Sequence, residues 1–165
     1  MAYLAKDDYT LRISLEYLDE VLATAANTSG LQPLNVLSNA ESWGMATIKS
    51  YLTTNYNIAA EFGKTGTSRN FQIMQVLIDL VQCTIHKTIN PRDVPEHVEN
   101  SCKEAIAWLM DARDGKIVVD LPVTTNTDGT VNHNKTFLDS QQKFISKPYQ
   151  DLSITQNNYP AGGLL

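Results

Sequence analysis

The sequence has little charge, and what charge it has is unevenly divided. Charged residues make up 19% of the 165 residues, and the 18 acids outnumber the 13 lysines and arginines to give a net charge of −5. The basic residues never cluster, which argues against a face that grips nucleic-acid phosphates but not against a channel wall past which DNA slides. Few charges are typical of a subunit that covers its surface with neighbours, and also of a small domain with a polar, uncharged surface.

Long apolar runs are absent and cysteines are few. No apolar run approaches membrane-spanning length, and the start MAYLAKDD does not resemble a signal peptide. We therefore expect synthesis in the cytoplasm and no membrane partner. In that reducing compartment the two cysteines, Cys83 and Cys102, are expected to be free, buried thiols.

Catalytic motifs are also lacking. Gly63-Lys64-Thr65 resembles the end of a phosphate-binding loop, but Ile58 stands where that motif needs its first glycine. The sequence has neither a Gly-x-Ser-x-Gly elbow nor a His-Glu-x-x-His pair, and its acids are spread over expected helix faces. We expect no enzyme and no cofactor.

One arrangement of metal-binding residue types is present. Cys83, His86, His97 and Cys102 have the spacing Cys-x2-His and His-x4-Cys, which offers four zinc ligands across a helical hairpin. Both cysteines, however, fall on apolar stripes, where cysteine serves as a small hydrophobic side chain. We expect no metal, and a stoichiometric metal in the purified protein would favour a metal-dependent enzyme instead.

Helical periodicity dominates residues 1–116. The spacing of apolar residues predicts a short helix near Asp7 and Asp8, and longer helices over about 14–29, 38–54, 71–90 and 93–114. The helix at 71–90 has two adjacent apolar rows and only a narrow, almost uncharged polar row. A face this wide is typical of the central helix of a bundle.

Local signals set the expected helix ends. Ser38 and Glu41 form a capping-box pattern, with Pro33 in a loop before it. Ser68 and Asp93 are the predicted caps of the last two helices. Gly115 is suited to the position that follows the final helix.

The pattern changes after residue 116. Residues 117–121 have strand character, Pro122 indicates a sheet edge, and Asp128-Gly129 predicts a hairpin turn. The remainder is polar with sparse apolar residues, which fits either an arm that lies on partner subunits or a disordered tail. The predicted interface residues are Val119, Leu121, Val123, Phe137, Leu138, Phe144, Ile145, Tyr149 and Tyr159.

The sequence thus predicts a mainly α protein: a four- to five-helix bundle over 1–116, then a β-hairpin and extended C-terminal arm over 117–165. Four stretches of it resemble the head–tail adaptor (neck) proteins of tailed phages, in particular the Mu-like prophage neck protein family. They are YLAKDD (3–8), IKSYL (48–52) followed by Tyr56, IDLV (78–81) and AIAWLMDARDGKI (105–117). The resemblance covers about residues 1–120.

The resemblance implies a structural virion protein. Such subunits form a ring, commonly twelvefold, that binds the portal protein and the tail or a second neck-ring protein and lets double-stranded DNA pass through its centre. The family has no known catalytic residues to carry over. This sequence departs from the family in a longer loop at 55–70 without the expected proline-rich stretch, and in its longer polar tail.

Two further interpretations stay open at this stage. One is a cytosolic helical binding or regulatory module with a disordered tail, which would not co-purify with virions. The other is a different neck or tail component such as a tail terminator, although those usually contain a β-sheet.

Overall fold

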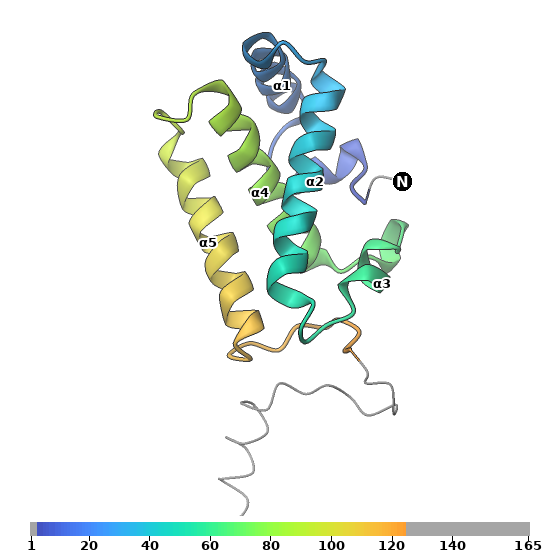
Figure 1. Ribbon diagram of the computed structural model, residues 1–165. Coiled ribbons are helices and arrows are strands. Elements are labelled where there is room, and N and C mark those ends of the chain that lie inside the picture. Colours follow the sequence, from blue (N-terminus) through green and yellow to red (C-terminus); the bar gives the residue numbers. More distant parts are fainter. Residues whose placement is uncertain (1–2, 125–165) are drawn as a thin grey trace, which may run out of the picture.

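The computed structural model describes residues 3–124, and this part of the chain is mainly helical, as predicted. Its elements in chain order are η1 (Lys6–Leu11), α1 (Leu15–Ser29), α2 (Pro33–Leu52), α3 (Ile58–Phe62), η2 (Gly66–Ser68), α4 (Phe71–Ile89) and α5 (Glu96–Arg113), where η marks a 3-10 helix (Figure 1). Within residues 3–124, no helix is both long and apolar enough to cross a membrane.

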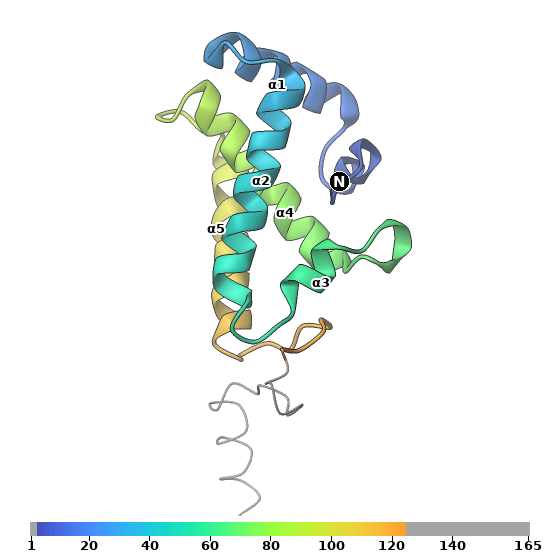
Figure 2. The ribbon, with the colours of Figure 1, turned by 45° about the vertical axis from the view of Figure 1, so that its right-hand side comes forward.

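Helix α4 lies at the centre of the bundle. Helices α1, α2, α5 and η1 all pack against it, and α2 also contacts α1 and α5. Figures 1 and 2 show α2 and α5 running alongside α4, with α1 crossing one end and α3 projecting beside the start of α4. The molecule is therefore built around a single helix that the others cover.

The two apolar rows predicted for the 71–90 helix are confirmed for most of their length. Ile73, Leu77, Ile78, Leu80 and Val81 are all buried in one hydrophobic core. Two residues of the expected polar row, Asp79 and His86, are buried as well, so α4 is enclosed on nearly all sides. Phe71 departs from the prediction, because the first turn of α4 leaves its ring 55% exposed.

Three predicted helix ends are confirmed. The Ser14 hydroxyl accepts a hydrogen bond from the Tyr17 amide and caps α1. Gly30 ends α1 with a φ of 71°, and Gly115 follows α5 with the same φ, a left-handed conformation that glycine adopts without strain.

The capping box predicted at Ser38 is wrong. Helix α2 begins at Pro33, and residues 38–41 lie inside it. Proline is well suited to a first turn because it lacks only an amide hydrogen that would have no partner there. The Glu41 carboxylate does not reach back to Ser38; it accepts a hydrogen bond from the Tyr9 hydroxyl at 2.7 Å.

Two other predicted caps are also wrong. Asn70, not Ser68, caps α4, and its side-chain oxygen accepts from the Ile73 amide at 3.1 Å. Helix α5 starts after Pro95 without a side-chain cap, so Asp93 lies in the preceding loop. The predicted loop at 55–70 contains the short helices α3 and η2.

The 117–124 segment is not the predicted strand. Its one β-bridge joins Val123 to Tyr56, with no further ladder in the described residues. Val119 and Leu121 point into the helical core, while backbone bonds from the Asn57 amide to the Pro122 carbonyl and from the Thr124 amide to the Asn55 carbonyl fasten the segment to the loop after α2. The alternation of apolar and polar residues in this segment places Val119 and Leu121 against the helices and does not mark a strand. The turn predicted at 128–129 lies outside the described residues.

Helices α2 and α4 approach closely at Gly44. A Cβ atom at this position would lie 2.6 Å from Cδ1 of Leu77, a side chain that is itself fully buried. A side chain at this position would therefore displace the buried end of Leu77, and a large side chain would displace more of the core.

We predict that Gly44→Leu lowers the free energy of unfolding by more than about 2 kcal/mol, because a buried site without free space must deform to admit the side chain. The matched control, Ala46→Leu, places the same side chain on the exposed face of α2 and should change stability by less than about 0.5 kcal/mol. Urea unfolding monitored by circular dichroism measures both. Equal effects of the two substitutions would contradict the close approach.

Candidate functional site

The predicted interface residues fall into three groups. Val119 and Leu121 are 4% and 8% exposed, so they belong to the chain's own core and are covered in this structure. Val123 is 41% exposed at the end of the described chain. The other six lie outside the described residues: Phe137, Leu138, Phe144, Ile145, Tyr149 and Tyr159.

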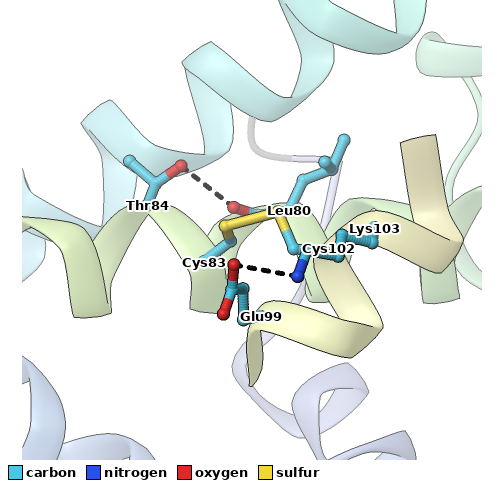
Figure 3. Close-up of a disulfide and its surroundings, with 6 residues drawn as sticks. All are labelled: Leu80, Cys83, Thr84, Glu99, Cys102 and Lys103. Atoms are coloured by element: carbon cyan, nitrogen blue, oxygen red, sulfur yellow. Dashed lines mark hydrogen bonds and ion pairs between the residues drawn. A yellow bond between two sulfur atoms is a disulfide. The ribbon is translucent and has the colours of Figure 1, made fainter. Parts of the chain in front are cut away.

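The two cysteines are joined in a disulfide, and the expectation of free thiols is therefore wrong. Cys83 of α4 and Cys102 of α5 face each other with their Cα atoms 6.0 Å apart (Figure 3). Cys83 lies six residues before Ile89, where α4 ends, and Cys102 lies six residues after Glu96, where α5 begins. The 90–95 loop joins these two helix ends. Antiparallel helices joined by a short loop bring such positions together.

The Cys/His set does not come together as four ligands. The sulfur atoms are bonded to each other, and the ring of His86 packs against Tyr17, whose hydroxyl lies 3.3 Å from Nε2. Burial is the main cause that lowers the pKa of His86, and the charge of the nearby His97 lowers it further. Within residues 3–124, no three histidine, cysteine or acidic side chains are grouped to hold a metal ion.

A groove of about 490 Å³ opens over the disulfide, and we call it the disulfide groove. It is bounded by the second half of α4, the 90–95 loop and one side of α5, and both cysteines line it. Cys83 is 1% exposed, whereas Cys102 is only partly buried. Cys102 is thus the more exposed of the two bonded cysteines.

The disulfide groove is lined mainly by apolar residues, and three of its four charged residues are cations. Lys87, Arg92 and Lys103 contribute to it, against one acid, Glu99. Lys103 pairs with Glu99 at 2.9 Å on the surface of α5 (Figure 3). Lys87 and Lys103 belong to different helices, α4 and α5, and only the packing of these helices brings them to one groove.

The Gly63-Lys64-Thr65 loop has a structural role. The Lys64 ammonium lies 2.6 Å from the carboxylate of Glu61, which is fully buried. The other oxygen of Glu61 accepts from the Tyr3 hydroxyl at 2.8 Å and from the Asn70 amide. Burial raises the pKa of Glu61, but these three donors outweigh burial and hold its pKa below the usual value.

Similar pairs hold the rest of the N-terminal segment (residues 3–12). The guanidinium of Arg69 binds both carboxylate oxygens of Asp8 and donates to the Tyr3 carbonyl at 2.7 Å. Tyr9 is fully buried and donates to Glu41 of α2. These contacts join the segment to α2 and to the loop before α4.

The last pair lies in a second, smaller cleft. Arg12 donates to Asp79 at 2.9 Å beside a hollow of about 270 Å³ between α4 and α5, where Glu104 and Trp108 also lie. Asp79 is 5% exposed, and its burial raises its pKa to about 6, with Arg12 opposing the shift and Glu104 adding to it. The cleft therefore holds a carboxyl that titrates near neutral pH.

Comparison of the chain with protein-family models, curated proteins and solved structures gave no significant match.

The pKa of Asp79 makes stability pH-dependent. Because the carboxyl has a pKa of about 6 in the folded protein against 3.8 ordinarily, the folded state holds the proton more tightly than the unfolded state does. The tighter proton binding stabilises the folded state by up to about 3 kcal/mol at low pH. This stabilisation is lost as the pH rises through 6.

Asp79→Asn should remove that pH dependence. We expect the stability of the variant relative to the wild type to rise by roughly 2 kcal/mol between pH 4 and pH 7, measured by urea unfolding at both values. Asp93→Asn, which removes an exposed carboxylate, is the control and should keep the wild-type profile. Parallel pH profiles for wild type and Asp79→Asn would contradict the assignment.

Proposed function

We propose that this chain is a structural virion protein: a head–tail adaptor subunit of the neck of a tailed phage. In this role copies form a ring, twelvefold by the resemblance, that joins the portal protein to the tail or to a second neck-ring protein. Double-stranded DNA passes through the ring without specific binding. The order of the four sequence stretches and the helical architecture support this proposal.

The observation that carries the proposal is the position of the exposed apolar side chains. Leu34 and Val118 are each 78% exposed, the largest values among the exposed large hydrophobic residues described. Leu34 belongs to the first turn of α2, and Val118 to the segment that crosses the opposite end of the bundle (Figure 1). Exposed apolar side chains at two opposite ends suit a subunit that joins partners above and below it.

The buried ionisable groups also favour a structural role. Glu61, Asp79 and Glu41 each bond a residue of the N-terminal segment instead of converging on a shared cavity. Their hydrogen bonds fix the N-terminal segment against the helices. Ionisable groups used in this way hold the subunit together, which fits a structural role.

Charge supports passage of DNA without tight binding. The whole chain carries a net charge of −5, so a ring of many copies is acidic overall. An acidic wall repels the phosphate backbone and does not hold it.

Leu34→Asp and Val118→Asp should each prevent incorporation of the chain into phage particles, because a charge at the centre of an apolar contact loses its hydration. Both side chains are exposed, so the purified variants should unfold within about 0.5 kcal/mol of the wild type. Ala23→Asp changes an exposed residue of α1 and is the control that should still enter particles.

The measurement is mass spectrometry of particles purified on a density gradient, with the portal protein as internal standard. We expect the wild-type chain to be present at about the copy number of the portal protein. A chain that remains entirely in the soluble fraction would contradict the adaptor role and favour the alternative, a cytosolic helical binding or regulatory module.

A further inference from the structure

Both cysteines of the Cys83–Cys102 bond line the disulfide groove, but they differ in exposure. Cys83 is 1% exposed and lies in the packed interior of α4, so a reagent in the groove cannot approach it freely. Cys102 lies on α5, is only partly buried and lines the same groove. Access, which is one determinant of thiol–disulfide exchange, therefore favours Cys102.

The charges around the bond favour an anionic reagent. Lys87 and Arg92 line the groove, and neither forms an ion pair within residues 3–124. The third cation, Lys103, is already paired with Glu99 at 2.9 Å. Two unpaired positive charges beside the sulfur attract a negatively charged thiol and stabilise a thiolate that forms there.

We propose that Cys102 is a site of reversible exchange with small anionic thiols, and that the disulfide groove is their binding site. A thiolate attacks Sγ of Cys102, the sulfur–sulfur bond breaks, and Sγ of Cys83 leaves with the electron pair and takes up a proton. The product is a mixed disulfide on Cys102 and a neutral thiol at Cys83. A buried neutral thiol packs as a small apolar group, so the core accommodates it.

A second thiolate completes the reduction. It attacks the sulfur of the small molecule in the mixed disulfide, and Cys102 leaves as a thiolate. Two thiols are then oxidised to one small-molecule disulfide, and the protein bond has accepted their two electrons. Reduction unlinks α4 from α5 near the 90–95 loop. This site does not depend on the adaptor role.

The first test uses the purified, full-length, oxidised protein with glutathione as the anionic thiol and cysteamine as the cationic one. At low ionic strength and equal thiolate concentration, glutathione should break the bond about three- to tenfold faster than cysteamine, because the groove attracts anions. Acid quenching, alkylation and mass spectrometry follow the reaction.

Two double variants distinguish the effect of charges in the groove from the effect of the net charge of the protein on the two rates. Lys87→Gln with Arg92→Gln should bring the ratio of the two rates close to one. The control, Lys6→Gln with Lys116→Gln, removes the same charge from exposed sites outside the groove and should keep the wild-type ratio. An unchanged ratio in the groove variant would overturn the assignment of the groove.

The second test identifies the sulfur that reacts. With oxidised glutathione, Cys102 in the Cys83→Ser variant should form the mixed disulfide about tenfold faster than Cys83 in the Cys102→Ser variant, because only Cys102 has access to solvent. Circular dichroism checks that both variants fold, and peptide mapping of the adduct trapped on the unsubstituted protein gives an independent reading. Adducts formed equally on both residues or mainly on Cys83, or two thiols that stay free under oxidised glutathione, would overturn the proposal.

Discussion

The structure depends on the burial of one helix. Helix α4 has apolar side chains around most of its circumference, and α1, α2, α5 and η1 cover them. No single neighbour is wide enough to remove that surface from water, so the bundle forms as one cooperative unit. The same constraint acts at Gly44, where an added Cβ atom would lie 2.6 Å from Cδ1 of Leu77 on α4.

Polar side chains on a helix that is buried this deeply need hydrogen-bond partners. The N-terminal segment supplies one such partner. Asp79 of α4 is bonded by Arg12, and His86 by Tyr17 of α1. Charges that are buried and paired add specificity to the packing even where desolvation cancels much of their attraction. The N-terminal segment also buries Tyr3, Leu4 and Tyr9 in the core. Five of its residues form hydrogen bonds or ion pairs with residues elsewhere in the chain: Tyr3, Lys6, Asp8, Tyr9 and Arg12.

Periodicity predicted the helices because burial on α4 and its neighbours repeats with the helical turn. Local cap signals were less informative: Ser38 and Glu41 have a capping pattern, yet the Pro33 start and the bond from Tyr9 to Glu41 determine the structure there. The disulfide groove was not predicted, since it depends on the pairing of α4 with α5. The symmetric positions of Cys83 and Cys102 about the 90–95 loop were the one available signal for that pairing.

The N-terminal contacts had no local signal, because the two residues of each pair lie 13 to 67 positions apart in the sequence. The positions of Val119 and Leu121 could not be predicted from the sequence either. Alternation of apolar and polar residues does not distinguish a strand from an extended segment that packs on helices. Both cases required the tertiary structure.

Hydrogen exchange of the full-length protein tests the central role of α4 most directly. Amides from Met74 to Ile85 should be the slowest to exchange, with a protection free energy equal to the free energy of global unfolding in urea. If these amides exchange through local openings of much lower free energy while another helix is better protected, α4 is not the element on which the fold depends.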